Sequence, residues 1–140
     1  MPITRFDHYT VRTNDVDATW RFYERALGFN VRKREGFPIP AFIVSTPDGT
    51  EVVHGFAASE EMESIFERLK PADDDTAKWR TGRLQHVEFW ATDLDEFRKR
   101  FNSESVPFSE RTLPDKHQVG VTDPNGIVVN LNFPLSEVGK

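Results

Sequence analysis

The chain has 140 residues, a formal net charge of −5, 37% hydrophobic residues and 29% charged residues. This composition is typical of a compact globular domain and excludes a disordered chain. The absence of cysteine excludes disulfides and cysteine-ligated metal sites, and it fits a reducing, cytoplasmic location. No apolar run resembles a signal peptide or a membrane span, so we expect no membrane association. The acidic net charge argues against nucleic acid as a partner.

The first part of the chain predicts one strand, one helix and three further strands. Residues 3–12 alternate between polar and apolar side chains, as in a half-buried strand. Asp15 or Asp17 then caps a helix, and Gly28 is well placed as its left-handed C-terminal residue. The apolar stripe of this helix consists of Val16, Trp20, Tyr23 and Leu27. The following strands are predicted at 29–35, 37–45 and 50–56, with a tight type I′ turn at Asp48-Gly49.

The segment 58–83 has a different pattern and is interpreted as a connector. Ser59 begins a predicted helix with one apolar face, and Pro71 ends it. Asp73, Asp74 and Asp75 follow. We interpret them as a solvated loop, because they lack the spacing of an EF-hand calcium loop.

The rest of the chain repeats the order of the first part. The interval from His8 to His86 equals the interval from Asp15 to Asp93, so the Asp93-Leu94-Asp95 segment is predicted to cap the second helix. The repeated elements are a strand at 84–92, a helix with the apolar stripe Leu94, Phe97 and Phe101, and strands at 106–111, 118–122 and 127–133. A tight turn at Asn125-Gly126 matches the one at Asp48-Gly49. The chain is therefore predicted to be a single domain of two βαβββ modules, module one at 3–57 and module two at 84–134.

Strand alternation assigns side chains to the two faces of each sheet. The predicted helices cover one face. In module one the opposite face carries His8, Thr10 and Arg12, and in module two it carries His86, Glu88 and Trp90. If the two sheets curl together, the two histidines face a shared concavity.

Four segments carry a resemblance to a known family: Asp7-His8, and residues 20–29, 85–89 and 123–131. Together they resemble the vicinal oxygen chelate superfamily, which includes glyoxalase I, extradiol dioxygenases and bleomycin-resistance proteins. The resemblance implies an α+β fold in which tandem βαβββ modules form a curved mixed sheet around a U-shaped pocket. It also implies a divalent metal ion (Fe, Mn, Ni, Co or Zn) and a homodimer.

The resemblance places His8 and His86 at the two histidine positions of the metal site. The glutamate position of the last strand is occupied by Asn130, which offers only a neutral carbonyl oxygen as third ligand. The matching position in module one is assigned to Val53. Two other side chains could replace the missing carboxylate. His54 would need a β-bulge to reach the same face, whereas Glu88 already shares a face with His86.

The implied function is a metal-dependent lyase, isomerase or dioxygenase-like enzyme acting on a small oxygenated substrate. Glu88 is the candidate general base, with a pKa expected to be raised beside Trp90. Thr10, Arg12 and Trp90 are candidate substrate-binding residues. The missing glutamate counts against a dioxygenase or glyoxalase I.

Two alternatives remain open at this stage. The first is a metal-free small-molecule or drug-binding protein, like the bleomycin-resistance members, and the second is a partner-binding module without a ligand. Each candidate also has a structural interpretation: a half-buried histidine is more often a hydrogen-bonded structural residue than a ligand. For His54 and His117 we favour a surface or structural role.

Overall fold

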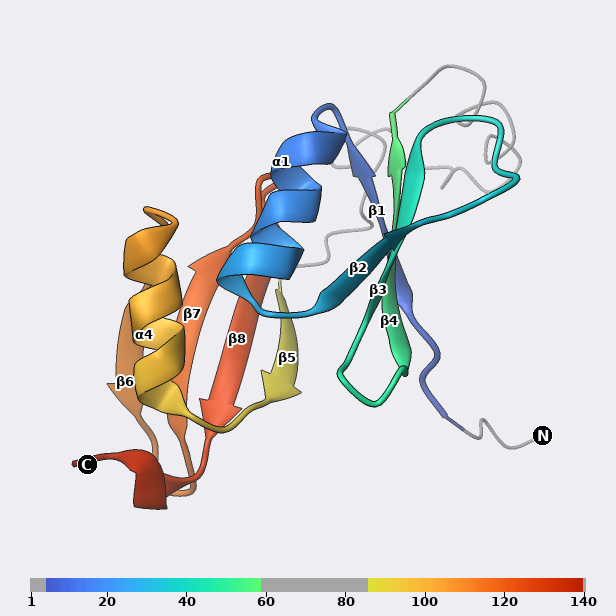
Figure 1. Cartoon of the computed structure of the whole chain (residues 1–140). Coiled ribbons are helices and arrows are strands. Elements are labelled where there is room, and N and C mark those ends of the chain that lie inside the picture. Colours follow the sequence, from blue (N-terminus) through green and yellow to red (C-terminus); the bar gives the residue numbers. More distant parts are fainter. Residues whose placement is uncertain (1–4, 59–85, 140) are drawn as a thin grey trace, which may run out of the picture.

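The computed structural model describes residues 5–58 and 86–139 (Figure 1). In module one, β1 (Tyr9–Thr13), β2 (Asn30–Lys33), β3 (Ala41–Ser45) and β4 (Glu51–Ala57) form one sheet in the order β1-β4-β3-β2. The β1–β4 pair is parallel and the other pairs are antiparallel. A parallel outer pair and a returning hairpin are what a βαβββ unit produces, because the helix connects the first strand to the far edge of the sheet.

Module two repeats this topology. The strands β5 (His86–Trp90), β6 (Ser109–Thr112), β7 (His117–Thr122) and β8 (Val128–Phe133) form a second sheet in the order β5-β8-β7-β6. Its helix is α4 (Leu94–Ser103), and the 3₁₀ turn η3 (Leu135–Glu137) follows β8. The predicted α+β fold of two βαβββ modules is confirmed, with two separate four-stranded sheets. The predicted connector helix and the three aspartates lie outside the described residues.

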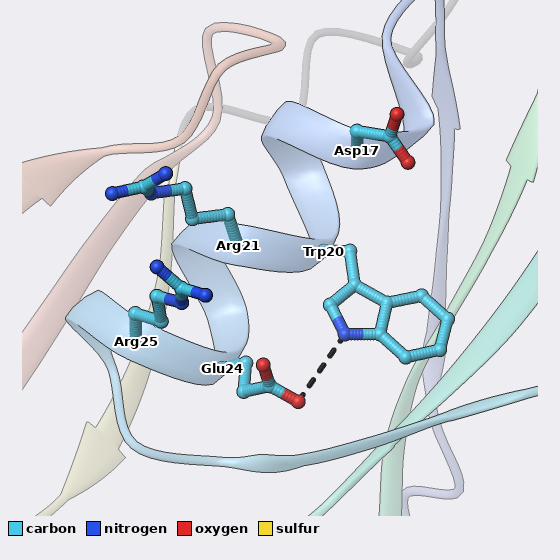
Figure 2. A pocket seen from close by; sticks show the side chains of 5 residues that line it. All are labelled: Asp17, Trp20, Arg21, Glu24 and Arg25. Carbon is cyan, nitrogen blue, oxygen red and sulfur yellow. Dashed lines mark hydrogen bonds between the residues drawn. The ribbon is translucent and has the colours of Figure 1, made fainter.

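The helix of module one has two parts, α1 (Val16–Arg21) and the π-helical η1 (Phe22–Ala26). Asp15 caps it, since its carboxylate accepts the backbone N–H of Ala18 at 2.9 Å. The chain leaves the helix at Gly28 with φ +77°, as predicted. Trp20 packs against the core, with its ring 5.8 Å from that of Phe42, and it also donates to Glu24 at 3.2 Å and lines an open groove along the helix (Figure 2).

The start of α4 differs from the prediction. Asp93 adopts a left-handed conformation, with φ +70°, and its side chain makes no capping hydrogen bond. The carboxylate of Glu137 caps the helix instead, accepting the backbone N–H groups of Asp93 at 3.0 Å and Leu94 at 2.7 Å. An acidic group at a helix N-terminus is favourable whichever part of the chain supplies it.

Both predicted hairpin turns are present, but the prediction of a type I′ turn at Asp48-Gly49 is wrong. A type I′ turn needs positive φ at both central residues. Gly49 has φ +88°, whereas Asp48 is not in the left-handed region. The carboxylate of Asp48 accepts the backbone N–H of Thr50 at 3.1 Å, which favours a turn with one left-handed glycine.

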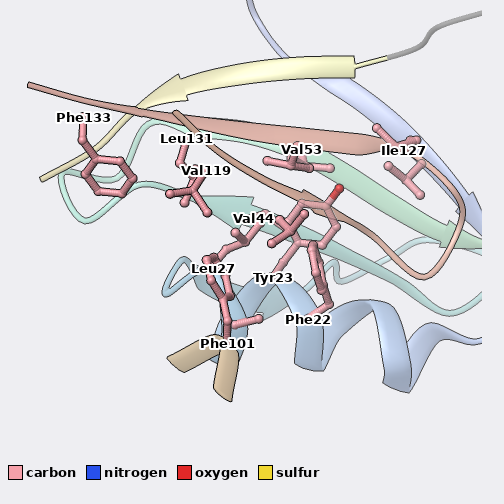
Figure 3. Close-up of a cluster of buried hydrophobic side chains, with 14 of the residues drawn as sticks. Phe22, Tyr23, Leu27, Val44, Val53, Phe101, Val119, Ile127, Leu131 and Phe133 are labelled. Atoms are coloured by element: carbon pink, nitrogen blue, oxygen red, sulfur yellow. The ribbon is translucent and has the colours of Figure 1, made fainter. Parts of the chain in front are cut away.

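One hydrophobic core joins the two modules (Figure 3). It combines the helix-covered faces of both sheets with the buried sides of the helices, including Phe22, Val44, Val53, Phe101, Val119, Val129, Leu131 and Phe133. The helix of module one also contacts module two directly: Tyr23 donates to Asp123 at 3.0 Å. The modules therefore pack within one chain, and the opposite faces of the two sheets lie outside this shared core.

Among the described residues, no helix is long and apolar enough to cross a membrane.

Candidate functional site

Each sheet has a polar face on the side away from the shared core. The sheet-one polar face carries the polar residues His8, Thr10, Arg12, Arg32, Arg34, Glu51 and His54, and the buried apolar residues Ile43, Ala41 and Phe56 lie between them on the same face. The sheet-two polar face consists of His86, Glu88, Trp90, Ser109, Arg111, Lys116, Gln118, Asn130 and Asn132. Most of the sequence-predicted site residues are therefore on these two faces, as strand alternation predicted.

A hydrogen-bond network covers the sheet-two polar face. Asn132 donates to Glu88 at 2.8 Å, and Gln118 donates to Glu88 at 3.2 Å. The other carboxylate oxygen of Glu88 is 3.1 Å from Nε2 of His86. Lys116 lies 3.6 Å from Glu88, which makes an ion pair. Glu88 is therefore the central acceptor of the face.

This network reverses the prediction for Glu88. The hydrogen bond from Asn132, with support from Lys116 and His86, lowers the pKa of Glu88 below its ordinary value. The raised pKa predicted beside Trp90 is wrong, because donors surround the carboxylate and Trp90 does not cover it: the indole is 66% exposed. A carboxylate that stays ionised and accepts several hydrogen bonds is a weak general base.

On the sheet-one polar face, two histidines lie together. The rings of His8 and His54 stack with centroids 3.7 Å apart and planes inclined by 22°. His8 also bonds to Asp7 at 2.5 Å, and His54 lies 3.3 Å from Glu51. Partial burial is the main cause of a lowered pKa for His54, which favours the neutral imidazole.

A β-bulge puts His54 on this face. Val44 pairs with Val53 whereas Ser45 pairs with Glu51, so Val52 is an extra residue in β4. Val53 consequently points into the core, where it is fully buried. The assignment of Val53 to the ligand position of module one is wrong.

His54 is the residue equivalent to Asn130. Thr10 pairs with His54 in the parallel pair of module one, and Glu88 pairs with Asn130 in the parallel pair of module two. Sequence spacing alone missed this match because the bulge shifts the register by one residue. The four repeat-equivalent positions therefore carry His8, His54, His86 and Asn130.

The metal site that the resemblance implies would draw its donors from His8, His86 and Asn130. Within residues 5–58 and 86–139, no three His, Asp or Glu side chains group so that they could hold a metal ion. The nitrogens of the stacked rings have separate carboxylate partners: His8 Nδ1 bonds to Asp7 and His54 Nε2 lies 3.3 Å from Glu51. Asn130 brings no charge to offset a cation.

The remaining candidates differ in their surroundings. Trp90 is highly exposed, Thr10 is exposed and Arg12 is half-buried. His117 is a structural residue, as favoured from the sequence. Its ring is buried on the helix side of sheet two, 2.7 Å from Glu110 and 2.9 Å from Thr112.

The groove beside α1 was not predicted as a site. It is lined by one stripe of the helix and is open to solvent (Figure 2). The lining residues are Asp17, Trp20, Arg21, Glu24 and Arg25. Four of the five are charged residues, and Trp20 belongs to the predicted apolar stripe, so the sequence pattern did not distinguish the groove from the ordinary boundary between helix surface and core.

Residues 5–131 match the family model described as the Glyoxalase/Bleomycin resistance protein/Dioxygenase superfamily. The chain belongs to this superfamily. The repeated topology and the repeat-equivalent polar positions of this superfamily member agree with that match. No curated protein matches the chain.

Solved structures similar to this superfamily member include proteins with different titles. One is a lactoylglutathione lyase from Agrobacterium tumefaciens, at 19% identity, with a TM-score of 0.61 and 100% of both chains covered. Another is TnmS3, an antibiotic-binding protein from Streptomyces sp. CB03234, at 20% identity and a TM-score of 0.64, covering 96% of this chain and 98% of that chain. A superfamily domain from Frankia sp. EAN1pec has 16% identity and a TM-score of 0.67, with 99% and 96% covered. At these identities the similarity concerns the fold alone.

Proposed function

We propose that this chain binds a small planar molecule on its sheet-two polar face without the help of a metal ion. The observation that carries the proposal is Trp90, which is 66% exposed at the β5 edge of an ordered polar face. A large exposed aromatic side chain beside fixed hydrogen-bonding groups is the usual composition of a ligand site. TnmS3, a protein of the same fold, is an antibiotic-binding protein, which fits this reading.

The register of the strands supports a flat ligand. Trp90, Asn132 and Gln118 form one row across the sheet, and Glu88, Asn130 and Gly120 form the next. The space above Gly120 in the second row is filled by neighbouring side chains, since a Cβ at this position would lie 3.1 Å from the Asn130 side-chain oxygen and 3.4 Å from the Ser109 hydroxyl. A planar molecule stacked on the Trp90 indole would reach the amide groups of the two rows from above.

Calorimetry with a neutral planar probe, 2-naphthol, tests this proposal. We expect binding to protein that has been dialysed against a chelator, and an affinity loss of about tenfold in Trp90→Ala, the value of one aromatic stacking contact. Trp20→Phe is the matched control, because Trp20 lines the groove beside α1 and not the polar face. Equal affinity in Trp90→Ala, or binding that requires an added divalent metal, would contradict the proposal.

Metal-dependent catalysis is the second candidate, and one observation favours it. Three of the four repeat-equivalent positions carry histidine: His8, His54 and His86. Neutral imidazoles are common ligands of Zn, Ni, Co and Fe. On this reading His8, His86 and Asn130 contribute to the ligand set, and Thr10 and Arg12 contact the substrate.

Metal analysis of protein purified without chelator or affinity tag decides between the two candidates. Near-stoichiometric Fe, Mn, Ni, Co or Zn that is lost in His8→Ala would favour the enzyme. Asn130→Glu should then raise the metal affinity, because a carboxylate offsets the cation's charge. No binding of any divalent ion, even in excess, would rule out the metal-dependent mechanism.

We also propose that the chain forms a homodimer. Phe6, two residues before His8, is 72% exposed in the described part of the chain. Covering such a side chain with a second copy is favourable. Sedimentation equilibrium should give twice the chain mass of 16.1 kDa. A monomer at all accessible concentrations would contradict the dimer.

A further inference from the structure

The charge of the two polar faces is opposite to the charge of the whole chain. The chain has a formal net charge of −5. The sheet-two polar face has two cationic side chains, Arg111 and Lys116, and one carboxylate, Glu88. The sheet-one polar face has Arg12, Arg32 and Arg34, with Glu51 as its carboxylate. Both faces therefore carry an excess of positive charge.

Arg111 is the cation of sheet two whose charge is not paired. Lys116 is 3.6 Å from Glu88, so these two charges offset one another. Arg111 is exposed and donates its Nε–H to the neutral side-chain oxygen of Gln118 at 2.9 Å. Among the described residues no carboxylate forms an ion pair with Arg111. A guanidinium in this state can receive an anion.

The network around Glu88 fixes the orientation of that guanidinium. Because Glu88 and Asn132 accept from the Gln118 amide nitrogen, at 3.2 and 2.9 Å, the Gln118 oxygen is turned toward Arg111. That oxygen accepts the Arg111 Nε–H. The two terminal nitrogens of the guanidinium remain as a fork that matches the two oxygens of an anionic group. Glu88 thus acts as a positioning residue for Arg111.

Arg111 and Trp90 stand at the two ends of one row. The register runs Trp90, Asn132, Gln118 and Arg111 across β5, β8, β7 and β6. At about 4.8 Å between neighbouring strands, the backbones of the end residues are roughly 14 Å apart. Arg111 reaches inward along this row, because its Nε–H donates to Gln118 at 2.9 Å, and Trp90 is 66% exposed at the other end.

Module one carries an arginine at the equivalent position. Arg34 extends the pairing of β2 with β3, because its backbone N–H donates to the Ala41 carbonyl, and Ala41 pairs in turn with Phe56. The equivalent row of module two is Arg111, Gln118 and Asn132. The guanidinium of Arg34 lies 4.4 Å from the centre of the Phe37 ring. In module one an aromatic ring therefore already occupies the space beside the arginine, whereas Arg111 has no such cover from the described residues.

We infer that the ligand of the sheet-two polar face is an aromatic anion whose carboxylate, sulfonate or phosphate is held by Arg111 while its ring stacks on Trp90. This inference rests on the proposed binding function and names the chemical class of the ligand.

Three probes of the same shape test the ligand class: 2-naphthoate, neutral 2-naphthol and cationic 2-naphthylmethylammonium. Calorimetry at pH 7 should give the tightest binding for 2-naphthoate, about tenfold over the cation, because hydrogen bonds to charged groups are the stronger ones. The affinity for 2-naphthoate should fall with added salt.

Arg111→Gln should weaken 2-naphthoate by about tenfold and leave 2-naphthol unchanged. Lys99→Gln, an exposed charge removed from α4, is the matched control and should change neither affinity. Thermal melting checks that both variants fold.

The outcomes separate this inference from the proposed function. Tighter binding of the cation, or an unchanged 2-naphthoate affinity in Arg111→Gln, would overturn the anionic class while binding on the face stands. If none of the three probes binds, the binding function itself fails and the inference fails with it.

Discussion

At the scale of single residues, Glu88 has the most connected side chain of the two polar faces. Its carboxylate receives amide donors from Asn132 and Gln118 and has Lys116 and His86 beside it. These contacts make Glu88 an organising residue, since they determine which way the Gln118 amide points. The sequence identified Glu88 as a pocket residue through strand alternation. It did not identify its donors, which come from β7 and β8.

The lowered pKa of Glu88 predicts a pH-dependent effect of Glu88→Gln. A carboxyl group whose pKa is lower in the folded state stabilises that state at every pH above its unfolded-state pKa, which is near 4.5 for Glu88. This stabilisation is lost as the pH falls through the folded-state pKa. At pH 7 the variant should be less stable, by up to about 1 kcal/mol for a partly exposed hydrogen-bonded group. The difference should vanish in acid.

Urea unfolding between pH 7 and pH 3 measures this effect. Glu35→Gln is the control, because Glu35 is exposed in a turn outside both polar faces. A stability difference for Glu88→Gln that stays the same over the whole pH range would contradict the role given to the carboxylate.

At the scale of secondary-structure elements, strand and helix periodicity predicted the eight strands and the helices of both modules. It failed where a feature depends on a partner element. The bulge at Val52 is defined by the pairing of β4 with β3, so nothing in residues 50–56 alone predicted that His54 faces outward. The cap of α4 is similar: an Asp in front of a helix is a good local signal, yet Glu137, which follows β8, makes the hydrogen bonds.

The cap predicts a specific loss of stability in Glu137→Ala. Removal of a side chain that accepts from the first N–H groups of a helix costs about 0.5 to 2 kcal/mol. Ser136→Ala, the exposed neighbour in the same turn, should change the free energy of unfolding very little. Urea denaturation of both variants measures the two values, and equal stability of Glu137→Ala and the parent would show that Asp93 or water serves the helix equally well.

At the scale of the whole molecule, a buried hydroxyl relay joins the two modules. The Tyr9 hydroxyl lies 3.2 Å from the Tyr23 hydroxyl, and the Tyr23 hydroxyl donates to the Asp123 carboxylate at 3.0 Å. Burial raises the pKa of Tyr9 to about 12, and the pKa of Tyr23 is also raised, so both hydroxyls stay protonated at neutral pH. Asp123 in turn holds the last hairpin by accepting from Asn125 and Ile127.

This relay predicts unequal effects for two conservative substitutions. Tyr23→Phe leaves a buried carboxylate oxygen of Asp123 without its donor and should lower the free energy of unfolding by about 1 to 3 kcal/mol. Tyr9→Phe keeps the Tyr23–Asp123 bond and should cost less. Chemical denaturation measures both, and a larger loss for Tyr9→Phe would contradict the relay.

The sequence could predict the two modules but not how the two modules pack against each other. Each helix stripe predicted a buried face, and the repeat predicted two sheets. The pairing depends on polar contacts between distant residues, such as Tyr23 with Asp123 and Asn125 with Thr19. Within the described residues the helix-covered faces of the two sheets share one core, so the polar faces lie on the sides of the sheets away from it.

The most direct test of the proposed binding site is nuclear magnetic resonance of chelator-dialysed protein titrated with 2-naphthoate. We predict backbone amide shifts concentrated in 86–90, 109–120 and 128–132, the strands of the sheet-two polar face, and their loss in Arg111→Gln. Shifts concentrated instead at Asp17, Trp20 and Glu24 would place the ligand in the groove beside α1, and shifts that appear only after a divalent metal is added would make the metal-dependent reading correct.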